Sequence, residues 1–175
     1  MQDVLAKAAK IKLLIFDVDG VLTDGSLFMD KDGHEYKAFN SLDGHGMKML
    51  QSTGVDIAII TGRSSDVVQH RMGSLGIKHI YQGQHDKRVA FEKLLSDLNL
   101  EASQVAYMGD DVIDLPVMRK VGLAVAVHNA HHLVKQHSHW QSEKVGGRGA
   151  ARDLCELIME AQGTLVSQMA VYLED

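Results

Sequence analysis

The sequence contains little cysteine, few aromatic residues and no long apolar run, and each absence narrows the possible class of protein. Cys155 is the only cysteine in 175 residues, so the chain cannot form an internal disulfide. Aromatic residues make up 5% of the sequence, so we expect a core of aliphatic and methionine side chains. No run approaches the roughly 20 apolar residues of a membrane-spanning helix, and residues 1–10 have no features of an export signal. We therefore expect a soluble, cytoplasmic protein.

The charge pattern argues against a nucleic-acid-binding protein. The formal net charge is −5, and Lys and Arg are scattered along the chain rather than clustered. Hydrophobic residues make up 45% of the chain, which is an ordinary proportion for a globular protein. We find no internal repeat and no linker rich in Pro, Gly or Ser, so we predict that residues 1–175 form a single domain.

Short apolar runs alternate with longer amphipathic stretches. The predicted strands cover residues 11–16, 55–60, 105–108 and 123–127, with a weaker one at 79–81. The predicted helices cover residues 44–51, 64–75, 87–98, 113–120 and 149–162. This alternation predicts an α/β fold, a Rossmann-like three-layer sandwich with a mainly parallel central sheet. Such a sheet binds its ligand beyond the carboxyl ends of the strands.

One segment breaks the alternation, at about residues 26–39. Two extended runs flank the dipeptide Asp32-Gly33, which is a strong signal for a β-hairpin. Because this hairpin follows the first strand, we expect it to extend over the carboxyl edge of the sheet.

Two aspartates follow the first predicted strand. Asp17 and Asp19 stand at the point where strand alternation ends, so both side chains can reach the space beyond the edge. Two carboxylates placed together repel each other unless a cation or a shared proton is present. An acidic turn without catalytic function explains this segment equally well, because Asp and Gly are common in loops.

A second acidic cluster follows the strand at residues 105–108. Asp110 and Asp111 come directly after it, and Asp114 lies one helical turn further on. Asp110 and Asp111 are also suitable caps for the next helix. Since the carboxyl ends of parallel strands meet at one edge, however, the two acidic segments should come together there. Oxygen ligands without thiols are suited to Mg²⁺.

Two further segments carry groups that can bind phosphate. Thr61 and Arg63 follow the strand at 55–60, where a hydroxyl and a guanidinium can hold phosphoryl oxygens. Lys87 stands at the start of a predicted helix. Taken alone, Thr61-Gly62 is a plain turn and Lys87 is a solvated charge, so both depend on the acidic segments for their significance.

In order, these four segments resemble the four motifs of the haloacid dehalogenase-like phosphatases. The resemblance implies that Asp17 is a nucleophile and that Asp19 is the general acid and base. It also implies that Thr61 orients the phosphoryl group, that Lys87 neutralises charge and that Asp110 binds Mg²⁺. The implied Mg²⁺ ligands are Asp17, Asp110 and the main-chain carbonyl of Asp19, with Asp111 or Asp114 as a supporting partner.

A narrower resemblance concerns the cap domain, which most members of this superfamily insert to close over the substrate. The intervals between the motifs leave room only for a hairpin and single helices, so we expect no cap. The segments DVDGVLTDG, KAFNSLDGHG, AIITGR, YQGQHDK, GDDVIDLPVM and GGRGAAR resemble a cap-less group of sugar-acid phosphatases in lipopolysaccharide synthesis. The resemblance implies a homotetramer in which a neighbouring subunit covers each active site.

The same resemblance implies which residues bind the substrate. They are Asp19, Asn40, Ser41, Leu42, Asp43, Gly44, Lys48, Arg63, Arg71 and Lys87. A sugar acid carries a carboxylate as well as a phosphate, which accounts for the number of cations. Ser41-Leu42 stands where the group usually has Val-Arg, and His45 replaces an aromatic residue. These departures concern the identity of the sugar acid more than the phosphatase activity.

The glycine-rich segment at residues 146–152 allows two interpretations. The glycines can simply connect to the last helix, or Arg148 can reach an anion in a neighbouring active site. The tail at about residues 163–175 is expected to be mobile or to dock on a partner subunit.

Three alternatives remain at this point. The first is a phosphatase for another sugar acid of the sialic acid type. The second is a non-catalytic module that regulates a nucleotide-sugar synthetase, although the full set of five catalytic-type residues disfavours it. The third is a receiver domain, which would need neither the hairpin nor the Asp-x-Asp pair.

Overall fold

A parallel β-sheet forms the centre of the molecule in the computed structural model, which describes residues 1–173. In this part of the chain the sheet has the strand order β5-β4-β1-β6-β7-β8, and every neighbouring pair is parallel. The strands are β1 (Leu13–Phe16), β4 (Asp56–Ile60), β5 (His79–Tyr81), β6 (Val105–Gly109), β7 (Leu123–Ala126) and β8 (Trp140–Gln141). The predicted α/β fold with a mainly parallel sheet is confirmed.

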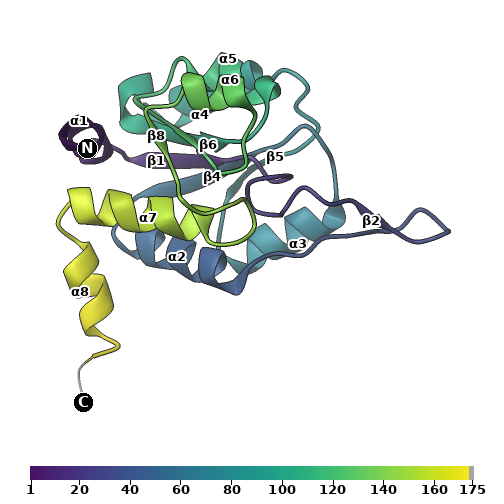
Figure 1. Ribbon diagram of the computed structural model, residues 1–175, viewed down its shortest axis with the longest axis horizontal. Helices are drawn as coiled ribbons and strands as arrows, with labels where there is room; N and C mark the ends of the chain where they lie inside the picture. The colour runs from purple at the N-terminus through teal and green to yellow at the C-terminus, as the bar shows by residue number, and fades with distance from the viewer. Residues whose placement is uncertain (174–175) are drawn as a thin grey trace.

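Helices cover both faces of the sheet and give the three layers visible in Figure 1. One face carries α2 (Ser41–Ser52), α3 (Asp66–Ser74) and α7 (Ala150–Ala161). The other carries α4 (Lys87–Leu98), α5 (Leu115–Met118) and α6 (His132–Gln136). Two single 3₁₀ turns, Ala102–Gln104 and Val112–Asp114, precede β6 and α5.

The middle strands are buried on both faces, as expected for a parallel sheet between two helical layers. Every residue of β1, β6 and β7 is buried. Methionines such as Met47 and Met72 fill space between the helices and the sheet, as the shortage of aromatic residues predicts. Cys155 is fully buried in the same core, where it behaves as a small apolar side chain.

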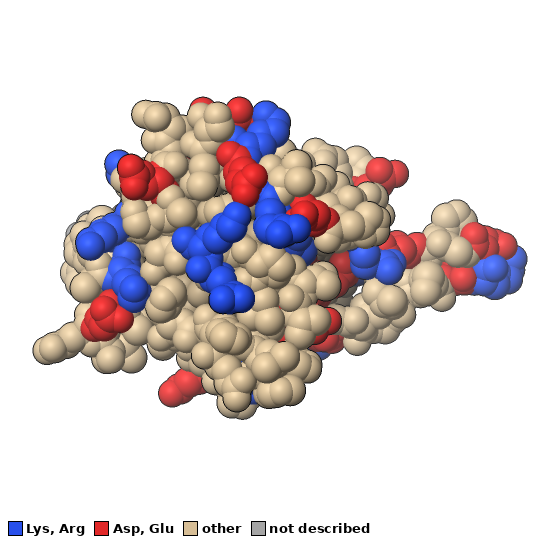
Figure 2. Space-filling view, turned by 90° about the horizontal axis from the view of Figure 1, so that it is seen from above, with Lys and Arg blue, Asp and Glu red and all other residues tan. Residues whose placement is uncertain are grey.

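The predicted hairpin is present and projects from the carboxyl edge of the sheet (Figure 1). It consists of β2 (Phe28–Met29) and β3 (Glu35–Tyr36), paired antiparallel. Figure 2 shows it extending away from the body, with basic and acidic side chains at its tip. Within the described residues no further insertion follows β1 or β4, so the active-site edge has no cap domain.

Four short elements were not predicted from the sequence. They are α1 (Gln2–Ala8), α6, β8 and α8 (Leu165–Ala170). Each is too short to show a clear periodicity, and each depends on packing against the sheet or against α7. α8 lies in the predicted tail, at about residues 163–175, and extends from α7 away from the body (Figure 1). The last two residues of this tail, 174–175, lie outside the described part. No helix of the described chain is long and apolar enough to cross a membrane.

Candidate active site

The carboxyl edge of the sheet brings the predicted motifs together. Phe16 pairs with Ile59 on one side and with Met108 on the other, so the residues that follow these three strands emerge side by side. They open into a pocket of about 190 Å³. Its lining comprises Asp17, Asp19, Thr61, Gly62, Arg63, Asp110, Asp111 and Ile113. Three separate sequence segments thus line one pocket.

Lys87 lies beneath this pocket and binds two aspartates. Its side chain is 1% exposed, and Nζ lies 2.8 Å from Asp17 Oδ2 and 2.7 Å from Asp114 Oδ1. The hydroxyl of Tyr107 donates to the same Asp114 oxygen at 2.7 Å. Asp86 caps the helix that carries Lys87 by accepting from the Arg88 N–H at 3.1 Å. A buried lysine held by two carboxylates has a fixed position, unlike a surface lysine.

Asp114 supports the acidic loop from below. Its Oδ2 accepts the main-chain N–H groups of Asp110 at 3.0 Å and of Asp111 at 3.2 Å. A Cβ on Gly109 would lie 2.6 Å from this oxygen, so glycine is needed there. Both Asp114 oxygens therefore have hydrogen-bond partners, Oδ1 from Lys87 and Tyr107 and Oδ2 from the acidic loop.

Gly20 allows Asp110 to approach the loop after β1. Its φ is +90°, and a Cβ there would lie 2.1 Å from Asp110 Oδ2. Any other residue would be strained in this conformation and would push the carboxylate away. The glycine of the Asp-x-Asp-Gly segment thus has a definite steric reason.

The charges in this cluster are not balanced by the protein alone. Burial, together with the charge of Asp114, raises the pKa of Asp17 to about 6, although Lys87 opposes the change. Burial and the charges of Asp114, Asp17 and Asp111 raise the pKa of Asp110 to about 8. Burial would lower the pKa of Lys87, but Asp114 and Asp17 outweigh it and raise that pKa. Two buried carboxylates, Asp17 and Asp114, share Lys87, and the half-buried Asp110 beside them forms no ion pair within residues 1–173, so the site has room for more positive charge.

A divalent cation fits this cluster. Oxygens of Asp17, Asp110 and Asp114 lie within 4.8 Å of one another. Asp110 Oδ1 is buried and has no hydrogen-bond partner among residues 1–173, which is costly unless another group binds it. Asp17 and Asp114 each have hydrogen-bond or ion-pair partners on both oxygens, so within residues 1–173 Asp110 Oδ1 is the oxygen of the three carboxylates with most capacity left for a cation. Oxygen donors of this kind suit Mg²⁺.

Asp19 faces the pocket from the other side and is held by the hairpin. Lys37 Nζ lies 2.5 Å from Asp19 Oδ1 and 3.2 Å from Glu35 Oε1. Glu35 Oε1 in turn accepts a hydrogen bond from Arg63 at 2.7 Å. Burial alone would raise the pKa of Glu35, but hydrogen bonds from Arg63 and Lys37 hold it below its ordinary value.

Thr61 completes the pocket at the end of β4. It is buried, and its main chain pairs with Tyr81 O and with the N–H of Gln84. These bonds fix the turn into Gly62 and Arg63. Thr61 thereby lies in the lining of the same pocket as Asp17 and Asp110.

The structure places the predicted substrate segment 40–44 beside the pocket rather than in it. Asn40 caps α2 by accepting from the Leu42 N–H at 2.8 Å, and Ser41 and Leu42 form the exposed first turn. Asp43 is buried and accepts the main-chain N–H groups of Gly149 and Arg152. In this structure Asp43 therefore joins α2 to the start of α7.

The basic residues predicted to bind the substrate lie at different distances from the pocket. Arg63 lines it directly. Arg71 lies against Gly44, where an added Cβ would be 2.4 Å from its Nη2, and Lys48 is exposed on α2. The structure thus brings Arg63 into the pocket, while Arg71 on α3 and Lys48 on α2 are not among its lining residues.

The glycine-rich segment packs on the loop that carries Asp19. The N–H of Gly147 donates to Val21 O at 2.8 Å, and a Cβ on Gly146 would lie 1.7 Å from Gly20 O. This close approach explains the glycines without a ligand. Arg148 is exposed and lies 3.6 Å from Asp24, outside the pocket.

Sequence reasoning missed Lys37, Glu35 and Tyr107. Glu35 and Lys37 are separated by one residue on an extended strand, so a period-two reading of the hairpin would have placed both on one face. In the sequence Tyr107 lies within an apolar run that predicts a strand, and nothing in its sequence context indicates a hydrogen bond to Asp114.

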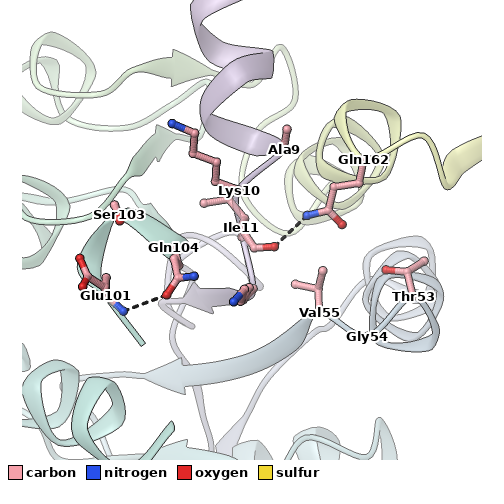
Figure 3. Close-up of a pocket in the computed structure, with 11 residues that line it drawn as sticks. Ala9, Lys10, Ile11, Thr53, Gly54, Val55, Glu101, Ser103, Gln104 and Gln162 are labelled. Atoms are coloured by element: carbon pink, nitrogen blue, oxygen red, sulfur yellow. Dashed lines mark hydrogen bonds between the residues drawn. The ribbon is translucent and has the colours of Figure 1, made fainter. Parts of the chain in front are cut away.

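A larger hollow, with a volume of about 710 Å³, lies at the opposite, amino-terminal edge of the sheet (Figure 3). Two of its polar side chains are paired within the hollow: Gln162 Nε2 donates to Ile11 O at 2.7 Å, and Gln104 Oε1 accepts from the Glu101 N–H at 3.0 Å. It contains no cluster of aspartates.

Comparison with known proteins agrees with the site. The sequence profile described as haloacid dehalogenase-like hydrolase matches residues 74–153. The chain is 51% identical over 163 residues to the 3-deoxy-D-manno-octulosonate 8-phosphate phosphatase of Yersinia pestis, covering 93% of this chain and 87% of that protein.

Two crystal structures superpose closely on this one. A probable YrbI family phosphatase from Pseudomonas syringae is 53% identical, with a TM-score of 0.99 over 100% of this chain and 99% of that chain. The 3-deoxy-D-manno-octulosonate 8-phosphate phosphatase from Moraxella catarrhalis, in complex with magnesium, phosphate and KDO, is 42% identical. Its TM-score is 0.96 over 98% of this chain and 99% of that chain. The chain therefore belongs to the haloacid dehalogenase-like hydrolases, within the family of the 3-deoxy-D-manno-octulosonate 8-phosphate phosphatases.

Proposed function

We propose that this phosphatase hydrolyses 3-deoxy-D-manno-octulosonate 8-phosphate to the free sugar acid and inorganic phosphate. The observation that carries the proposal is the buried cluster of Asp17, Lys87 and Asp110, in which Asp110 Oδ1 has no partner within residues 1–173. The relatives that bear this activity in their names share about half of their sequence with the chain.

The proposed reaction has two steps centred on Asp17. A carboxylate oxygen of Asp17 attacks phosphorus, the ester P–O bond breaks, and Asp19 gives a proton to the leaving alcohol oxygen. Asp19 then takes a proton from water as the water oxygen attacks the aspartyl-phosphate. Phosphate leaves, and the Asp17 carboxylate is restored.

The other residues hold the reacting groups and balance charge. The main-chain N–H of Val18 donates to Asp17 Oδ1 at 2.6 Å and Lys87 binds Oδ2, so the carboxylate cannot rotate freely. Thr61 is placed to donate to a phosphoryl oxygen. Lys87 offsets part of the negative charge that the phosphate brings to a site already rich in carboxylates.

The proposed cofactor is Mg²⁺, held by the carboxylates of Asp17 and Asp110 and by the main-chain carbonyl of Asp19. When bound, it would reduce the repulsion between these carboxylates and an anionic phosphate and polarise the phosphoryl group. The unpartnered Asp110 oxygen and the raised pKa values of Asp17 and Asp110 support such a ligand set.

The sugar acid would extend from the pocket over α2 and α3. Arg63, at the pocket wall, and Arg71 and Lys48 beyond it supply cations for the carboxylate and hydroxyl groups of the substrate. Segment 40–44 forms the first turn of α2 on this route. In this proposal the product enters lipopolysaccharide synthesis in the cytoplasm.

We also propose that the chain acts as a single-domain homotetramer whose neighbouring subunits cover the open sites. The hairpin supports this, because Phe28, Met29 and Tyr36 are each more than half exposed, at 54%, 59% and 61%. Apolar side chains exposed together on a projecting element mark an interaction surface.

A phosphatase for another sugar-acid phosphate, of the sialic acid type, is the second candidate. Ser41-Leu42 favours it, because these residues stand in the exposed first turn of α2 where the group usually carries an arginine. A non-catalytic module that regulates a nucleotide-sugar synthetase has less support, because it would not need the costly burial of Lys87 among carboxylates.

Phosphate release from a panel of sugar-acid phosphates tests the proposal, with p-nitrophenyl phosphate as a generic control. We expect the highest kcat/KM for 3-deoxy-D-manno-octulosonate 8-phosphate. A higher value for a sialic-acid-type phosphate would select the second candidate, and no release from any compound would leave the non-catalytic module.

A further inference from the structure

The hairpin carries one lysine that is buried against the active site. The side chain of Lys37 is 1% exposed and touches both Asp19 Oδ1 and Glu35 Oε1. Lys31, at the tip of the same hairpin, is 88% exposed and pairs only with its neighbour Asp32. The two lysines therefore provide a natural comparison between an engaged and a solvated cation.

Strand alternation explains why the hairpin can reach the site. Glu35 and Lys37 are two residues apart and point the same way, toward the sheet edge, whereas Tyr36 between them is 61% exposed. Glu35 Oε1 lies 2.7 Å from Arg63 Nη2, and Arg63 Nε lies 3.9 Å from Asp19 Oδ2. Two residues of the hairpin and two of the sheet edge thus close a ring of four alternating charges.

This ring leaves the two oxygens of Asp19 in different environments. Oδ1 accepts the short hydrogen bond from Lys37. Within residues 1–173, Oδ2 accepts no hydrogen bond, and Asp19 lines the pocket. One oxygen is therefore anchored, and the other is available to carry a proton.

Packing alone does not explain Lys37. Removing a lysine from water is costly. Replacing both members of a buried ion pair by apolar side chains of similar volume is often possible without loss of stability. The lysine also does not line the pocket, so it is not placed to touch the substrate. What it touches is the carboxylate proposed to move the proton.

We propose that Lys37 is a positioning residue that fixes Asp19, through Oδ1, in the orientation from which Oδ2 delivers its proton to the leaving alcohol. The inference rests on the proposed function, in which Asp19 is the general acid and base. Glu35 binds both Lys37 and Arg63 and so keeps these two cations in position.

Dependence on the leaving group tests this idea. A poor leaving group needs a proton from Asp19, whereas p-nitrophenolate leaves without one, so only the poor one depends on the position of Asp19. The probes are p-nitrophenyl phosphate, phenyl phosphate and glycerol 1-phosphate, none of which carries a sugar carboxylate. The readout is kcat/KM, which covers the steps up to release of the alcohol.

We expect Lys37→Met to lower kcat/KM for glycerol 1-phosphate by about 100-fold, and for p-nitrophenyl phosphate by less than about threefold. Phenyl phosphate should fall between them. Lys37→Arg should restore most of the loss, because a guanidinium can also donate to Asp19 Oδ1. The matched control Lys31→Met should behave as the unmodified protein with all three compounds.

A double variant separates positioning from an independent effect. If Lys37 acts through Asp19, Lys37→Met combined with Asp19→Asn should be no less active than Asp19→Asn alone. An additional loss in the double variant would contradict the proposal.

An equal loss of kcat/KM with all three probes in Lys37→Met, accompanied by a lowered Tm, would overturn the inference in favour of a purely structural lysine. If Lys37→Met does not fold, Glu35→Gln replaces it, with the same selective loss expected on a smaller scale. An equal loss there would also overturn it. Failure of the proposed function is distinct, because it would appear in the unmodified protein with the substrate panel, as a higher kcat/KM for another sugar-acid phosphate or as no phosphate release at all.

Discussion

The two edges of the sheet differ in the hydrogen bonding of their polar groups, and pocket volume does not reflect this difference. The amino-terminal edge has the larger hollow, about 710 Å³, and the carboxyl edge has a pocket of about 190 Å³. In the larger hollow the side chains of Gln104 and Gln162 bind neighbouring main-chain groups, as where Gln104 accepts from the Glu101 N–H at 3.0 Å (Figure 3). In the smaller one a buried oxygen of Asp110 has no partner within residues 1–173. Unbalanced charge, rather than volume, marks the reactive edge.

The largest contrast between the edges should appear in activity. Asp17→Asn should lower kcat by about 10³-fold or more, because it removes the attacking carboxylate. Glu101→Gln, in the larger hollow, should leave kcat unchanged. Phosphate release measures both, and a circular dichroism melt checks that the variants are folded. Substantial turnover by Asp17→Asn would remove Asp17 from the role of nucleophile.

Removal of the metal should affect only the carboxyl edge. Treatment with EDTA should lower kcat/KM by about 100-fold or more, since the carboxylates would then repel the phosphate, and added Mg²⁺ should restore it. The protein should remain folded throughout, as judged by circular dichroism. Full activity in the presence of a chelator would disprove the magnesium proposal.

The edges should also differ in stability. Asp114→Ala should lower the free energy of unfolding by about 3 kcal/mol, because it leaves Lys87 and Tyr107 without their shared buried acceptor. Ser103→Ala at the amino-terminal edge should change it by no more than about 0.5 kcal/mol. Urea unfolding measures both values. Similar values for the two variants would show that the acidic edge is not held together by this network.

The smallest expected effect is the pH dependence of metal-free stability. Asp17 and Asp110 have folded-state pKa values raised from 3.8 to about 6 and about 8. Between the unfolded-state pKa of 3.8 and these folded-state values, the folded state binds more protons than the unfolded state. These two groups therefore make the free energy of unfolding fall as pH rises from about 4 to about 8.

Mg²⁺ replaces the bound protons, so its stabilising effect should grow over the same range. The increase in Tm on adding Mg²⁺ should be larger at about pH 8 than at about pH 5.5. Thermal melts at the two pH values measure it. An increase that is independent of pH would mean that the metal does not compete with these protons.

Much of the fold could be read from the sequence because its signals are local. Apolar runs such as residues 105–108 and 123–127 are typical of strands buried in a parallel sheet, and the Asp32-Gly33 turn predicts a hairpin. The five strands predicted for the sheet begin and end within two residues of the observed bounds. The short helices α1, α6 and α8 were not predicted, because helices of so few residues are stabilised by tertiary packing rather than by a periodic pattern in their own sequence.

The site could be predicted only in part, for a similar reason. Asp17 and Asp110 follow strands, so the parallel topology was enough to bring them together. Lys37 contacts Asp19, which lies 18 positions away in the sequence. This contact depends on the direction of the hairpin, which no local pattern fixes. The same holds for Asp43, predicted to contact substrate, whose carboxylate is bound by the start of α7 in the structure.

The sequence by itself determined the parallel sheet, the hairpin and the aspartates at the strand ends, because these depend on side-chain alternation and on turn residues next to one another. Only the tertiary structure decided the contacts between the charges: Lys87 is shared by Asp17 and Asp114, Lys37 anchors Asp19, and within residues 1–173 Asp110 Oδ1 has no hydrogen-bond partner. Electrostatic interactions of this kind depend on distance and burial, and both are set by packing between segments far apart in the chain.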